Sequence, residues 1–224
     1  MMNDKVRPTK TQCYINALTK WVRCGGKEPQ GLLKGSILFL FCAIPVITYG
    51  PARLAAVYYM GRRCEGFNVT LKEAAVFGFR SGGKSMKSWV MGLSDFLAIL
   101  LAIGSGYAIL EMSLPLLMRF MYSAVLLLDL IYLHSGIYRY PALAGEPENK
   151  VKMLMLRGFL LTVVSPLLSF LFFCVQLLWL MICMLTGVGL PLLYPAGAVL
   201  LSHCAYTQMI KRFLPAKGKT RKKK

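Results

Sequence analysis

The chain has 224 residues, of which 56% are hydrophobic and only 16% are charged, and 27 Lys and Arg against 9 Asp and Glu give a formal charge of +18. A soluble domain carries about 25% charged residues, so the composition excludes an ordinary water-soluble globule. The apolar content equally excludes a disordered polycation. What remains is a small polytopic membrane protein with basic parts outside the bilayer.

Residues 1–30 form a basic leader that lacks the apolar core of a signal peptide. Within it, Tyr14, Leu18 and Trp21 recur at helical spacing, and Gly25-Gly26 predicts the end of the helix. A helix of this basic and aromatic kind either lies at the membrane interface or is an ordinary solvated helix.

Five long apolar runs follow the leader. The last four are each close to the roughly 20 residues that span a bilayer as a helix, and they are continuously apolar rather than alternating. The fold class predicted is therefore an all-α, polytopic helical membrane bundle, with a transmembrane domain at 31–210 and a basic tail at 211–224. The runs are 32–60, 89–110, 114–137, 158–185 and 188–206.

Basic residues in the connections predict the topology. The 61–88 loop, the 138–157 loop and the C-terminal tail are rich in Lys and Arg, whereas the turns near 112 and 187 have none. The positive-inside rule therefore places the C-terminus in the cytoplasm. The run 32–60 either crosses once, which puts the basic leader outside, or turns back as a hairpin at Gly50-Pro51. The hairpin is favoured, because it places the N-terminus in the cytoplasm with the other basic segments.

Residues 78–85, from Gly78 to Ser85, match the phosphate-loop pattern GxxxxGK[ST] letter for letter. The context predicts a helix before this segment, capped by Thr70, instead of the strand that a phosphate loop requires. We therefore expect no nucleotide here. Nucleic acid is not expected either, because the charge lies between apolar runs instead of on a soluble face. The basic side chains of this region are expected to bind anionic lipid headgroups, namely Arg80, Lys84 and Lys87.

Asp95 and Asp129 lie on opposite arms of a predicted hairpin, each seventeen positions from Met112. They are therefore expected at similar depth in the inner half of the bilayer, where a charge is costly. One interpretation is a proton or cation site that includes His134, because neighbouring carboxylates raise one another's pKa. The other is structural, with one carboxylate near the interface and the other hydrogen-bonded within the bundle.

Arg53 and Arg119 are expected in the outer half, near Glu111 at the outer turn. They either reach the interface and pair with Glu111, or line a vestibule for an anion or a sugar. Seven cysteines without any CxxC spacing indicate neither a disulfide framework nor a zinc site. No arrangement of catalytic, metal-ligating or cofactor-binding residues stands out, so the chain is not expected to be an enzyme.

The segment 36–52, which contains Pro45-Val46-Ile47-Thr48-Tyr49-Gly50-Pro51-Ala52, resembles the opening of the YesL-like family of bacterial multi-pass membrane proteins. Phe77-Gly78-Phe79-Arg80, Tyr138-Arg139-Tyr140-Pro141 and Pro166 resemble later parts of that family, so the likeness extends over about 15–213. The family has no established activity. The resemblance implies a plasma-membrane protein linked to carbohydrate uptake, and it implies no catalytic residues.

The function expected is that of a non-enzymatic accessory protein of a sugar importer, acting through helix contacts with permease subunits in a bacterial plasma membrane. The alternative is a small independent transporter that uses Asp95 and Asp129. A weaker third hypothesis is an insertase-like factor whose basic tail, at 217–224, meets ribosomes.

Overall fold

The computed structural model describes residues 9–43, 48–111, 115–145, 150–187 and 189–213. In these residues the chain forms helices and no strand, as the composition predicts. The helices are α1 (Lys10–Lys27), α2 (Pro29–Ala43), α3 (Tyr49–Cys64), α4 (Leu71–Arg80), α5 (Gly83–Glu111), α6 (Leu116–Gly145), α7 (Val151–Val164), α8 (Pro166–Leu185) and α9 (Gly189–Phe213).

The first and fourth helices begin with capping boxes. In α4 the Thr70 side chain accepts from the backbone N–H of Glu73, and Glu73 accepts from that of Thr70, which confirms the predicted cap. Thr9 and Gln12 make the same exchange at α1. The α1 helix continues past the predicted stop at Gly25-Gly26 and ends at Lys27.

The first apolar run is split into two helices that pack side by side and antiparallel, as the hairpin interpretation predicts. The predicted position of the break is wrong, because Gly50 and Pro51 lie inside α3, which begins at Tyr49, and α2 ends at Ala43. Gly50 is instead needed for packing. A Cβ added at Gly92 of α5 would lie only 2.7 Å from the Cα and N of Gly50, so the two backbones cross where neither residue has a side chain.

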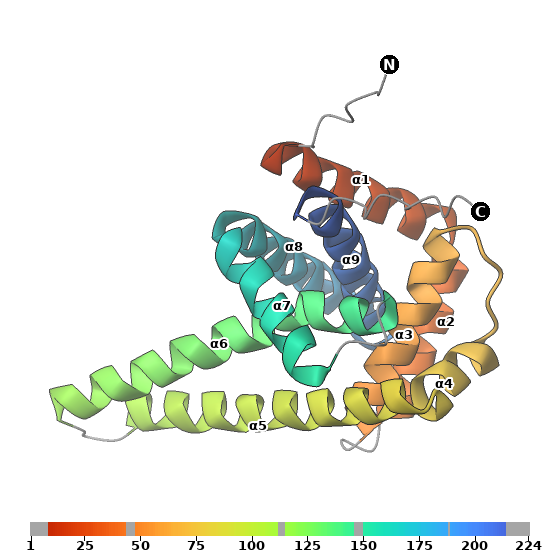
Figure 1. Ribbon diagram of the computed structural model, residues 1–224. Helices are drawn as coiled ribbons and strands as arrows, with labels where there is room; N and C mark the ends of the chain where they lie inside the picture. Colours follow the sequence, from red (N-terminus) through yellow and green to blue (C-terminus); the bar gives the residue numbers. More distant parts are fainter. Residues whose placement is uncertain (1–8, 44–47, 112–114, 146–149, 188, 214–224) are drawn as a thin grey trace, which may run out of the picture.

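The next two helices, α5 and α6, form the predicted antiparallel hairpin. They have 29 and 30 residues, and their distal halves extend away from the rest of the bundle (Figure 1). The base of the hairpin contacts α3, α4, α7 and α9. Pro141 lies inside α6, so the helix continues into what the sequence predicts to be a cytoplasmic loop.

The fourth run is divided at Ser165, and Pro166 occupies the first turn of α8, where a proline without its N–H costs no helix hydrogen bond. The last helix, α9, lies in the middle of the bundle and packs against α1, α2, α3, α6 and α8 (Figure 1). Among the residues that the structure describes, three helices are long and apolar enough to cross a membrane, namely α5, α6 and α8. The expected five spans are not confirmed, because the first run forms two short helices and α9 does not reach that composition.

Candidate functional site: a buried arginine–aspartate cluster

Three helices bring charged side chains together at the base of the hairpin. Arg139 of α6 is fully buried, and its Nη2 donates to Asp95 Oδ1 of α5 at 2.8 Å. The Tyr140 hydroxyl donates to Asp95 Oδ2 at 2.9 Å. Both carboxylate oxygens of Asp95 therefore accept hydrogen bonds from α6, and the carboxylate itself is only 3% exposed.

Arg53 of α3 completes the cluster. Its Nη1 lies 3.7 Å from Asp95 Oδ2 and donates to the Tyr49 hydroxyl at 3.0 Å. Its guanidinium lies over the Tyr140 ring, 4.6 Å from the ring centroid. The sequence predicts Arg53 and Asp95 in opposite halves of the bilayer, and this is wrong, because the structure places them in contact.

The cluster holds two cations and one anion, so it carries a net positive charge inside the bundle. Aromatic faces offset part of this excess: the Arg139 guanidinium lies 4.1 Å from the Tyr132 ring centroid. Arg139 Nη2 also donates to the Tyr132 carbonyl at 3.1 Å, and the Tyr132 hydroxyl donates to Ser94 Oγ at 2.6 Å. Within the described chain, Nε and Nη1 of Arg139 have no hydrogen-bond partner.

Small residues make room for this guanidinium group. A Cβ at Gly158 of α7 would lie 2.5 Å from Arg139 Cγ, and one at Gly136 would lie 3.3 Å from Arg139 Nη2. The cluster therefore ties α3, α5 and α6 together and fixes the base of the hairpin, because breaking a buried ion pair leaves an uncompensated charge.

The other predicted polar residues of the hairpin are not partners of Asp95. Asp129 is half-buried, and its Oδ2 has no hydrogen-bond partner among the residues described. His134 packs edge-on against Phe173 of α8, with ring centroids 5.5 Å apart. Asp95 bonds instead to residues that lie further along α6.

The remaining candidates are spread over the fold. Arg119 is exposed on the distal part of α6, twenty residues from Arg139, or about 30 Å along a helix. The Glu111 side chain lies outside the described part of the structure. Arg80 is exposed and Lys87 half-buried, whereas Lys84 lines a cavity at the base of the bundle.

Arg139 and Tyr140 are not among the expected site residues, because the sequence predicts a cytoplasmic loop at 138–157. The available signal was apolar continuity: Ile137, Ala142, Leu143 and Ala144 extend the third run well beyond Arg139. An isolated charge between two tyrosines in such a run is typical of a buried, paired side chain. In the described ranges, no three His, Cys, Asp or Glu side chains gather as metal ligands would.

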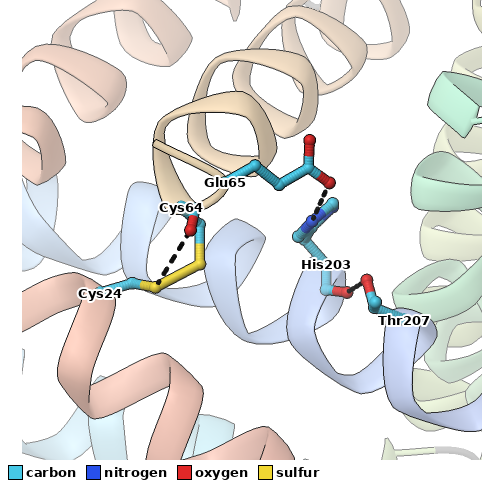
Figure 2. Close-up of a disulfide and its surroundings, with 5 residues drawn as sticks. All are labelled: Cys24, Cys64, Glu65, His203 and Thr207. Atoms are coloured by element: carbon cyan, nitrogen blue, oxygen red, sulfur yellow. Dashed lines mark hydrogen bonds and ion pairs between the residues drawn. A yellow bond between two sulfur atoms is a disulfide. The ribbon is translucent and has the colours of Figure 1, made fainter. Parts of the chain in front are cut away.

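The structure also corrects the expectation of no disulfide. Cys24 of α1 and Cys64 of α3 are joined, with Cα atoms 5.5 Å apart (Figure 2). Beside them, His203 of α9 points toward Glu65, whose Oε1 lies 4.0 Å from Nε2 (Figure 2). Burial, and to a smaller extent the nearby Lys20, lower the pKa of His203 to about 4, so this histidine is neutral at pH 7.

In comparisons with known proteins, no protein-family model, curated protein or solved structure matches the chain. The resemblance to the YesL-like family stays a prediction from the quoted motifs.

Proposed function

We propose that this chain is an integral membrane protein that acts without catalysis, as an accessory subunit whose α5–α6 hairpin packs against helices of a membrane partner. One observation supports this most: the distal hairpin exposes long apolar faces that nothing else in the described chain covers. Monomeric soluble proteins rarely expose large contiguous apolar surfaces.

The exposure runs along both arms of the hairpin. On α5, Leu101 is 56% exposed and Ile103 64%; on α6, Leu117 is 73% exposed and Phe120 70%. In water this surface would be costly, at roughly 25 cal/mol for each square ångström of apolar area. In a bilayer it costs nothing, and closely fitting helices of another protein can pack on it.

Small residues on α5 add a place where another helix can approach closely. A Cβ at Gly104 or at Gly106 would meet no atom within 4 Å, so these glycines make no close contact within the chain. Small residues of this kind permit close packing of helices in a membrane. Ser105 between them is buried, so we infer that a helix of a partner packs on the two glycines alone.

The resemblance to the YesL-like family suggests the class of partner, which is a permease subunit of a carbohydrate importer. It also suggests the bacterial plasma membrane as the location. The basic tail and leader then contact anionic lipid on the cytoplasmic side. The proposal assigns no substrate to this chain itself.

The experiment that tests the proposal is photo-crosslinking in native membranes. A photoreactive amino acid at Ile103, on the exposed hairpin, is expected to crosslink to a transporter permease subunit identified by mass spectrometry. The matched control carries the same group at Ile15 of α1, which is 55% exposed but lies off the hairpin. The accessory role would be rejected if position 103 crosslinks to lipid alone. It would also be rejected if position 15 crosslinks to the permease subunit as efficiently as position 103.

The alternative, an independent transporter built on Asp95 and Asp129, has less support. Both carboxylate oxygens of Asp95 accept hydrogen bonds, and the donors are Arg139 and Tyr140, so the expected pairing of Asp95 with Asp129 is not formed. Proton-coupled uptake into reconstituted vesicles that is abolished by Asp129→Asn would favour this alternative instead.

A further inference from the structure

A cavity of about 640 Å³ lies where α3, α4, α5, α6 and α9 meet at the base of the bundle. It is larger than the neighbouring cavities of about 210 and 270 Å³ beside α1 and α2. Its size falls within the roughly 300–1,000 Å³ of typical ligand pockets. The five helices that border it come from distant parts of the sequence, so it exists only in the folded bundle.

The charges around this cavity are mostly positive. Arg62, Lys84 and Lys211 line it, and the acidic side chain among its lining residues is Glu65. Glu65 lies 3.8 Å from Arg62 Nη1, so its charge is already partly balanced. In the described part of the chain, no acidic side chain forms an ion pair with Lys84 or Lys211. The cavity therefore offers an anion at least two uncompensated cations.

An aromatic wall stands beside these cations. The rings of Tyr58 and Phe77 stack with centroids 3.9 Å apart. Lys84 Nζ lies 4.5 Å from the Phe77 centroid, and the Arg62 guanidinium lies 5.8 Å from that of Tyr58. Two of the three cations, Lys84 and Arg62, therefore lie over aromatic faces. The wall suits the apolar or ring-shaped part of such a ligand.

We propose that this cavity binds a phosphate-bearing organic ligand, with the phosphate between Lys84, Lys211 and Arg62 and the attached group against Tyr58 and Phe77. Several cations around one site suit the charge and the multiple acceptor oxygens of a phosphate. The same chemistry is offered by an anionic phospholipid headgroup and by a soluble organic phosphate. The inference is independent of whether a partner helix packs on the hairpin.

The test measures binding to the full-length protein in an uncharged detergent by titration calorimetry. The probes are dihexanoyl phosphatidylglycerol and glycerol 3-phosphate, with zwitterionic dihexanoyl phosphatidylcholine as the comparison. We expect the anionic probes to bind more tightly than the zwitterionic one. If only the phosphatidylglycerol binds, the ligand is a lipid headgroup; if glycerol 3-phosphate binds alone or competes, the phosphate group itself is what the cavity recognises.

Two variants in the cavity and one charge-matched control outside it locate the binding. Lys84→Gln with Lys211→Gln is expected to weaken it at least tenfold, whereas Lys72→Gln with Lys150→Gln removes the same charge from exposed positions outside the cavity and is expected to leave it unchanged. Gly145→Phe keeps every charge but places a large side chain in the cavity, because Gly145 lines it and a Cβ there meets no atom within 4 Å. This variant is also expected to weaken binding. Equal losses in the two lysine variants, or no binding of either anionic probe below about 1 mM, would overturn the proposal.

Discussion

At the scale of single residues, the feature that most defines this molecule is the buried set of Arg53, Asp95 and Arg139. The sequence shows the three charges, but it cannot show that they meet. Arg139 lies 44 residues from Asp95 in the chain, and their contact depends on the antiparallel packing of two long helices. Asp95 and Asp129, in contrast, are related by a simple symmetry of the hairpin, which is why the sequence suggested that pair.

Breaking the ion pair between Asp95 and Arg139 is expected to destabilise the fold strongly. Asp95→Asn and Arg139→Gln should each lower the free energy of unfolding by about 3–5 kcal/mol, because each removes one member of the buried, hydrogen-bonded Arg139–Asp95 pair. The double variant should lose less than the sum of the two. Reversible denaturation in mixed micelles, followed by circular dichroism, measures all three. Asp129→Asn serves as the control, and a loss there as large as for Asp95→Asn would contradict this account.

The disulfide closes a loop with a sequence separation of 40 residues. By the chain-entropy model such a link contributes up to about 4 kcal/mol. Cys24→Ser is therefore expected to lower the melting temperature, and a reductant should lower it in the native chain but not in that variant. Cys174→Ser, at an exposed free cysteine, should change nothing. If the reductant leaves the melting temperature of the native chain unchanged, the disulfide does not stabilise the fold.

His203 makes stability depend on pH. Its pKa is about 4 in the folded chain and about 6.5 when unfolded, so the unfolded state binds more protons between these values. The contribution of His203 to the free energy of unfolding is therefore fully present above pH 6.5. It is lost as the pH drops toward 4, by on the order of 3 kcal/mol. Comparing the unfolding of the native chain with that of His203→Asn isolates this contribution. If the free energy of unfolding depends on pH in the same way in the native chain and in His203→Asn, the predicted contribution of His203 is ruled out.

At the scale of helices, several features that depend on local pattern could be predicted from the sequence. The Thr70 cap, the hairpin of α5 and α6, and the doubling back of the first run all appear. The break in that run was misplaced because glycine followed by proline is usual in turns, yet proline is also well tolerated in the first turn of a helix. What the glycine permits is a close contact with α5, which local pattern does not reveal.

The crossing of α3 and α5 gives a matched test on one helix. Gly92→Ala puts a methyl group 2.7 Å from the backbone of Gly50, so we expect strong destabilisation, on the order of the 1–3 kcal/mol seen for overpacked cores. Gly104→Ala lies in open space on the same helix and should stabilise it by up to about 1 kcal/mol through helix propensity. Thermal unfolding compares the two. Equal effects would mean that the helices do not cross at Gly92.

At the scale of the whole molecule, the fold divides into a compact bundle and an apolar hairpin that extends from it (Figure 1). The bundle carries the polar features: the arginine–aspartate cluster, the disulfide and the basic cavity. Exposed leucines, isoleucines and phenylalanines lie along the hairpin and also along α7 and α8, where Leu167 is 71% exposed and Phe170 61%. Composition alone predicted a membrane protein with basic parts outside the bilayer. It could not predict this division, because apolar helices that line a core and apolar helices that face lipid have the same composition.

The most direct test of the whole account is whether the distal hairpin lies in lipid. An environment-sensitive fluorophore is attached to Ile103→Cys, and to Lys72→Cys on the exposed side of α4, in protein reconstituted into vesicles. At position 103 we predict quenching by lipid-attached spin labels and none by aqueous iodide, with the reverse at position 72. Iodide quenching at position 103 as efficient as at position 72 would contradict a membrane-embedded hairpin.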